Sequence, residues 1–98
     1  MDRERALNIL RDLQAPLAAR GIAHAAVFGS VARDEGNRRS DIDVFVTPFE
    51  GAQLSLFDLG GIQTILEEAF RADVYVVVSP VSDAALRGAI SRDRADAF

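Results

Sequence analysis

The sequence contains no cysteine and no lysine. Without cysteine the chain can form neither a disulfide bond nor a thiolate zinc site, which excludes a disulfide-stapled secreted scaffold and favours the cytoplasm. Without lysine, a lysine nucleophile, a Schiff base and the lysine of a P-loop are excluded. No apolar run approaches the roughly 20 residues of a membrane span. The first ten residues also lack the apolar segment of a secretory signal.

The charge balance is acidic, with 15 Asp and Glu against 11 cationic residues, all of them Arg, and a net charge of −4. This balance argues against broad, non-specific nucleic-acid binding. It does not exclude a nucleotide ligand, because metal ions or a few arginines can offset phosphate charge locally. With 98 residues, 49% of them hydrophobic, the chain is expected to form one compact domain over residues 1–98.

Apolar residues at helical spacing predict three helices. The first covers residues 2–20 and is expected to be kinked or shortened by Pro16, which lacks a backbone donor. The second covers residues 56–70. The third covers residues 82–97, is capped by Ser82 and is interrupted near Gly88.

Three apolar segments predict strands over residues 22–28, 41–46 and 72–78. A short turn or helix opens at Ser30, and Pro48 is expected to end the second strand. The order α, β, short α, β, α, β, α predicts an α/β (α+β) fold. We expect a three- or four-stranded mixed sheet flanked by helices.

Two of the predicted strands carry carboxylates among residues that otherwise have the apolar pattern of a buried strand. Asp41 and Asp43 are two residues apart, so their side chains leave the same face with Cα atoms about 7 Å apart. Asp73 opens the third strand. Partly buried like charges are costly unless they are paired or bind a metal, and carboxylate oxygens suit Mg²⁺. An aspartate that bridges two ions would make a two-metal phosphoryl-transfer site.

A second element is the pair Gly29–Ser30, where the first strand turns into a helix start. Glycine permits close approach of a ligand, and the hydroxyl and amide of Ser30 suit a phosphate. Arg33 lies about one turn further on, within reach of the same phosphates. Taken singly, each feature has a plain alternative: an ordinary turn, an exposed edge pair of acids, or a solvated strand terminus at Asp73.

The spacing of these features is more specific. The stretch GSVARDEGNRRSDIDVFV, residues 29–46, resembles the signature of the DNA polymerase β-type nucleotidyltransferase superfamily. It is similar above all to the minimal nucleotidyltransferases, the MNT-type antitoxins that are encoded beside HEPN-domain toxins. The resemblance implies the minimal polymerase β-type nucleotidyltransferase fold for the whole chain.

The resemblance also implies roles for individual residues. Gly29, Ser30 and Arg33 would bind the triphosphate of ATP, with Ser40 as a further nucleotide-binding residue that supports the acid strand. The three aspartates would bind two Mg²⁺ ions, and Asp73 would accept the proton of the attacking hydroxyl. The implied reaction is transfer of AMP to a tyrosine of a HEPN toxin, which makes the chain an antitoxin in a toxin–antitoxin pair.

Two positions depart from the family pattern. Asp34 stands where glycine often follows the arginine, and Tyr75 stands where a small or apolar residue is commoner. Asp34 leaves open a non-catalytic antitoxin that neutralises its toxin by binding. A small-molecule (antibiotic) nucleotidyltransferase is a further alternative. No direct nucleic-acid or membrane partner is expected, and the apolar helical faces of so small a domain allow a homo-oligomer.

Overall fold

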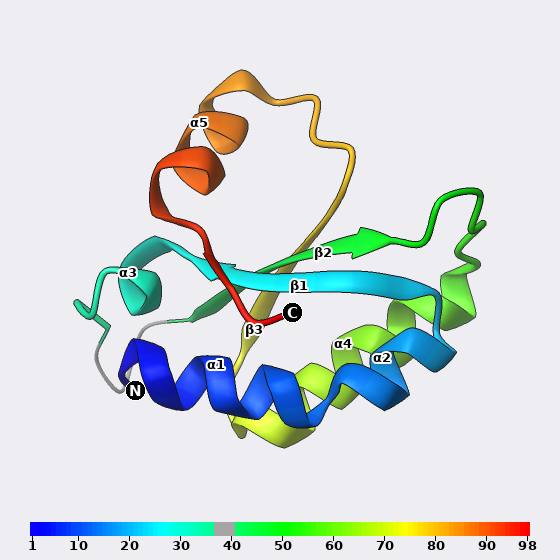
Figure 1. Cartoon of the computed structure of the whole chain (residues 1–98), viewed down its shortest axis with the longest axis horizontal. Coiled ribbons are helices and arrows are strands. Elements are labelled where there is room, and N and C mark those ends of the chain that lie inside the picture. Colours follow the sequence, from blue (N-terminus) through cyan, green and yellow to red (C-terminus); the bar gives the residue numbers. More distant parts are fainter. Residues whose placement is uncertain (37–40) are drawn as a thin grey trace.

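The computed structural model describes residues 1–36 and 41–98. Its centre is a four-stranded mixed sheet with the strand order β3-β2-β1-β4 (Figure 1). The strands are β1 (Ile22–Phe28), β2 (Ile42–Pro48), β3 (Val74–Val78) and β4 (Ala95–Asp96). β2 runs antiparallel to β1 and parallel to β3, and β4 runs antiparallel to β1. The predicted mixed sheet is confirmed, and β1 has the predicted bounds.

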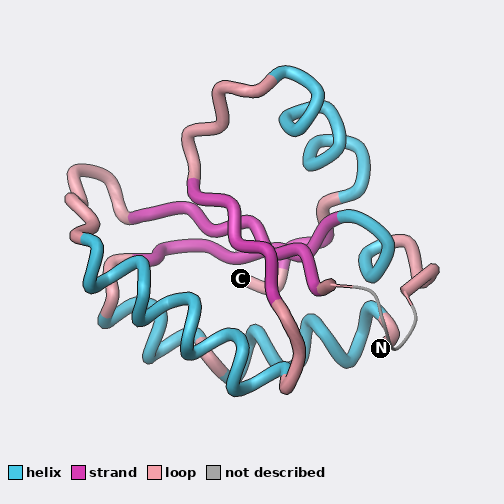
Figure 2. Tube along the Cα trace, turned by 180° about the vertical axis from the view of Figure 1, so that it is seen from behind, coloured by secondary structure: helices cyan, strands magenta, loops and turns pink. Residues whose placement is uncertain are grey.

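Five helices surround this sheet in the described part of the chain. They are α1 (Arg3–Asp12), α2 (Gln14–Ala19), α3 (Gly29–Ala32), α4 (Leu56–Phe70) and α5 (Ala84–Asp93). Figures 1 and 2 show α1, α2 and α4 on one side of the sheet and α5 on the other. No helix in residues 1–36 and 41–98 is long and apolar enough to cross a membrane.

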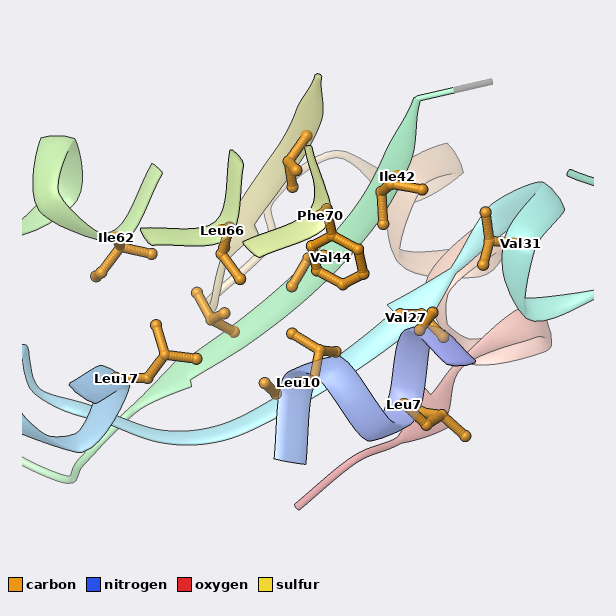
Figure 3. Packing of buried hydrophobic residues seen from close by; sticks show 14 of the residues in the cluster. Leu7, Leu10, Leu17, Val27, Val31, Ile42, Val44, Ile62, Leu66 and Phe70 are labelled. Atoms are coloured by element: carbon orange, nitrogen blue, oxygen red, sulfur yellow. The ribbon is translucent and has the colours of Figure 1, made fainter. Parts of the chain in front are cut away.

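The main core lies between the sheet and the helices α1, α2 and α4. Alternate residues of β2 point into it, so Ile42, Val44 and Val46 are buried while the residues between them are half-buried. Figure 3 shows the side chains of Leu10, Leu17, Ile62, Leu66 and Phe70 converging on this face. Full burial of one such side chain contributes about 1.5–3 kcal/mol.

A smaller apolar cluster holds α5 against the opposite face. It consists of Phe28, Val77 and Ile90, with Phe45 packed at its margin. This cluster covers only part of the face, so the half-buried residues of β2 lie at the border between packed and open surface. The candidate site lies on this face.

The predicted helix over residues 2–20 is divided at Leu13 into α1 and α2. The break lies three residues before Pro16. A proline in a helix has no amide hydrogen for the carbonyl four residues earlier, and its ring clashes with that carbonyl. For Pro16 that carbonyl belongs to Asp12, the last residue of α1, so the expected kink becomes a change of helix.

The prediction of a helix to residue 97 capped by Ser82 is wrong. Asp83 is the cap, because its carboxylate accepts a hydrogen bond of 2.8 Å from the amide of Leu86. The helix passes through Gly88 without interruption and ends at Asp93. The chain then pairs with the free edge of β1 as the short strand β4, which satisfies backbone groups that would otherwise face solvent.

Candidate active site

The three aspartates lie along the start of two parallel strands. Asp43 is the second residue of β2, while Asp41 and Asp73 directly precede β2 and β3. The amide of Ile42 donates a 3.1 Å hydrogen bond to the carbonyl of Asp73, and Asp43 pairs with Tyr75. Laterally paired residues share a face of a sheet. Asp41, Asp43 and Asp73 therefore lie on the face opposite the main core.

Sharing a face does not yet make a metal cluster. Within residues 1–36 and 41–98, no group of three or more Asp, Glu, His or Cys side chains is arranged to hold a metal ion. The convergence of the three carboxylates on ions stays a prediction. Desolvation by burial and then repulsion from Asp41 raise the pKa of Asp43, and Arg33 opposes this rise. A divalent cation between the two carboxylates would relieve the same repulsion, so the pair fits such an ion.

Gly29 lies directly against the carboxylate of Asp43. Phe28, at the end of β1, pairs with Asp43, and Gly29 follows it with φ +72°, in the left-handed region. A Cβ at Gly29 would overlap the Asp43 carboxylate oxygen. Glycine is thus favoured at this position for two reasons. It adopts the left-handed backbone conformation without strain, and it leaves room for the Asp43 carboxylate. The next residue, Ser30, is half-buried at the start of α3.

Arg33, predicted to bind phosphate, is held by two acids. Its Nη1 donates to Asp93 at 2.5 Å and its Nε donates to Glu35 at 3.0 Å. Hydrogen bonds to Glu35 and then to Asp93 raise the pKa of Arg33. Its charge also acts on Asp43, whose pKa it lowers. The guanidinium is thus held by one acid at the end of α5 and one in the turn after α3.

Asp93 is a residue that the sequence did not point to. Its side chain is only 4% exposed and accepts hydrogen bonds from Arg33 and from Arg92, the latter at 3.0 Å. The bonds from Arg92 and then from Arg33 lower the pKa of Asp93. Asp93 follows Arg33 by 60 positions, so no local pattern could have linked them. In the sequence Asp93 is one of several acids in the last predicted helix, and nothing distinguishes it from the others.

Asp34 is engaged by the first residue of α1. Its carboxylate accepts a 2.7 Å hydrogen bond from the amide of Arg3 and lies 3.7 Å from the guanidinium of that residue. Its φ of 58° is in the left-handed region, which favours glycine and tolerates aspartate. Asp34 thus joins the turn after α3 to the start of α1. Ser40, also predicted at the site, lies outside the described residues.

Comparison with known proteins identifies the relatives of this chain. Residues 3–95 match the family model described as nucleotidyltransferase domain. A curated relative from Methanocaldococcus jannaschii, named as a protein adenylyltransferase, is 39% identical over 70 residues, which cover 71% of this chain and 73% of the relative. A solved structure described as a minimal nucleotidyltransferase is 31% identical, with a TM-score of 0.76 over 97% of this chain and 95% of the other.

Two toxin–antitoxin structures share the fold at lower sequence identity. One, a complex with AMP-PNP, has a TM-score of 0.74 and 20% identity over 94% of this chain and 72% of the other. The second holds the MNT antitoxin with the tri-AMPylated HEPN toxin of Shewanella oneidensis, with a TM-score of 0.68 and 17% identity over 98% and 71% of the two chains. Together the comparisons confirm the resemblance that residues 29–46 predict, and with it the fold.

Proposed function

The chain belongs to the nucleotidyltransferase domain family and is a nucleotidyltransferase; from this premise we propose that it transfers AMP from ATP to a HEPN toxin. The reaction requires Mg²⁺, the acceptor is a tyrosine hydroxyl, and residues 1–98 act as one domain. AMP on the toxin blocks its activity, which makes the chain the antitoxin of the pair. The names of the relatives support the donor and the partner: one structure contains AMP-PNP, and another an AMPylated HEPN toxin.

The observation that carries the proposal is the register of β2 against β3. It pairs Ile42 with Val74 and Asp43 with Tyr75, so Asp41 and Asp73, which directly precede the two strands, lie at the same edge of the sheet as Asp43. Gly29 lies against Asp43 at this edge. Such an arrangement offers carboxylates for metal-bound phosphates next to a glycine turn that lets the Asp43 carboxylate lie close to the backbone. The engagement of Asp34 by Arg3 supports catalysis over the non-catalytic alternative, because the guanidinium offsets the negative charge of this additional acid.

In the proposed reaction the acceptor oxygen attacks the α-phosphorus of ATP. The new P–O bond joins AMP to the acceptor, the bond to the β-phosphate breaks, and pyrophosphate leaves. Mg²⁺ bound by Asp41, Asp43 and Asp73 would supply charge neutralisation at the phosphates. Gly29, Ser30 and Arg33 orient the triphosphate. Asp73, beside the acid pair, takes the proton of the acceptor hydroxyl.

The test is an AMP-transfer assay with the cognate HEPN protein, ATP and Mg²⁺, followed by intact mass spectrometry. The partner should gain the mass of one or more AMP groups with the wild-type chain and none with the double variant Asp41→Asn/Asp43→Asn. The double variant Asp12→Asn/Glu50→Gln removes two exposed negative charges elsewhere and should retain transfer. Both double variants must first be shown to fold by circular dichroism.

Two outcomes would contradict the proposal. An unchanged mass of a partner that demonstrably binds the wild-type chain would exclude transfer to that partner. A folded Asp41→Asn/Asp43→Asn variant that still neutralises the toxin in cells would assign the antitoxin effect to binding alone. Transfer to a free antibiotic without any protein partner would favour the small-molecule alternative.

A further inference from the structure

A cavity of about 540 Å³ lies on the same side of the sheet as the aspartates. It opens between α5 and the segment that follows β3, and its walls include Phe45, Val81, Arg87, Ile90, Ser91 and Arg94. Its size is in the range of cavities that bind small molecules. None of the functions assigned above to individual residues uses this cavity.

The cavity is next to the acid pair. Phe45 follows Asp43 by two residues on β2 and shares its face, which corresponds to about 6.6 Å along the strand. The last turn of α5 borders the cavity and also contacts Arg33. Ile90 of α5 and Arg94, which directly follows the helix, border the cavity, and Asp93 between them holds Arg33.

The cavity walls suit a flat, polar-edged ring. The guanidinium of Arg94 lies 5.4 Å from the centre of the Phe45 ring and is fixed by Asp96 at 2.9 Å. Arg87, held at Val81 by a 3.4 Å bond to its carbonyl, supplies a second planar donor group. No carboxylate among the described residues lines the cavity. Guanidinium planes and aromatic rings both stack on nucleobases. The N–H groups of a guanidinium also donate hydrogen bonds to the ring nitrogens and carbonyl oxygens of a base.

We propose that this cavity holds the purine base and ribose of the nucleotide donor, an inference that rests on the proposed function. With the α-phosphate at Asp41 and Asp43, the nucleoside extends along β2 toward Phe45. The acceptor has a different route, because its hydroxyl must lie beside Asp73. Asp73 lies four positions before Val77, and Val77 pairs with Phe45. Four residues of extended chain correspond to about 13 Å, which separates the acceptor hydroxyl from the base.

The experiment compares two ligands that share a phosphate chain. ATP and inorganic tripolyphosphate are titrated with Mg²⁺ into the full chain by isothermal titration calorimetry. Arg87→Ala removes a donor, and Ser91→Phe fills the cavity from an exposed position of α5. Both changes should weaken ATP about tenfold and leave tripolyphosphate unchanged. Arg5→Ala, an equal loss of charge on the exposed side of α1, should leave the binding of both ligands unchanged.

The outcomes separate this inference from the proposed function. Equal ATP affinity in wild type, Arg87→Ala and Ser91→Phe overturns the cavity assignment, while AMP transfer by the wild type stands. The same holds if the variants raise only the KM for the acceptor protein, or weaken both ligands equally. If the two variants lose only ATP affinity, and the wild type transfers no AMP to a verified partner, the cavity assignment is supported and the proposed reaction is overturned. If the wild type binds neither ligand, both proposals are wrong.

Discussion

Replacing Gly29 with alanine should both destabilise the fold and displace a catalytic acid. At φ +72°, a residue with a Cβ costs about 1–2 kcal/mol. The new Cβ also overlaps the carboxylate of Asp43, and turning that side chain out of its rotamer costs roughly 0.5–1.5 kcal/mol more. The free energy of unfolding should therefore fall by about 1.5–3.5 kcal/mol. Each kcal/mol corresponds to about 4–8 °C in Tm for a domain of this size.

Gly51 provides the matched control, since its φ is +80° and a Cβ there would meet nothing within 4 Å. Gly51→Ala should therefore cost only the backbone part, about 1–2 kcal/mol, and retain AMP transfer. Gly60 lies in α4 in open space, without a positive φ. Gly60→Ala should accordingly stabilise the protein by about 0.5–1 kcal/mol.

The decisive measurement is a double-mutant cycle of Gly29→Ala with Asp43→Ala, followed by urea unfolding. Without the carboxylate the overlap disappears, so the cost of Gly29→Ala should fall to that of Gly51→Ala. The single variant Gly29→Ala should also lose AMP transfer. The reasoning is refuted if Gly29→Ala costs no more than Gly51→Ala, or if its cost is the same with and without the Asp43 carboxylate.

Three further predictions concern other parts of the molecule. Folding raises the pKa of Asp43, so the ionised carboxylate destabilises the metal-free protein at a pH above that pKa, while the protonated form does not. Asp43→Asn should therefore raise Tm at about pH 7 and leave it unchanged at about pH 3. Asp93→Asn should raise the KM for ATP severalfold through Arg33, with partial rescue by Asp93→Glu, in steady-state assays. Leu66→Ala should cost about 2–5 kcal/mol in urea unfolding, and exposed Leu56→Ala less than about 0.5 kcal/mol.

Each of these predictions has a contrary result. A gain in Tm for Asp43→Asn that is the same at both pH values would show that charge is not its cause. An Asp93→Asn variant with lowered kcat and unchanged KM would separate this acid from nucleotide positioning. Equal losses for the two leucine variants would contradict the burial assigned to them.

Local patterns were sufficient to predict what depends on neighbouring residues. The apolar run of residues 22–28 fixes β1, and alternation in residues 41–46 assigns Asp41 and Asp43 to the face away from Ile42 and Val44. Strand parity is set by the backbone, so this assignment needs no tertiary information. The confirmed resemblance follows from the same short stretch. The roles of the individual site residues stay predictions, Ser40 among them.

Features that depend on distant contacts were not predictable. β4 contains two residues, too few for a periodic signal, and forms because the edge of β1 is free for Ala95 and Asp96. The ion pair of Arg33 with Asp93 depends on how α5 crosses the sheet. The end of α5 at Asp93 has the same origin, since pairing with β1 outweighs the helical pattern that continues to residue 97.

The loop from Phe49 to Ser55 follows β2 at the end remote from the aspartates, about 20 Å from them along the strand. This separation makes the loop a suitable attachment point for engineering. An affinity tag or a single cysteine for a fluorescent dye, placed at exposed Gln53, would leave the strand register untouched. Because the chain has no cysteine of its own, such a dye would label one defined position and allow encounters with a partner to be followed in real time.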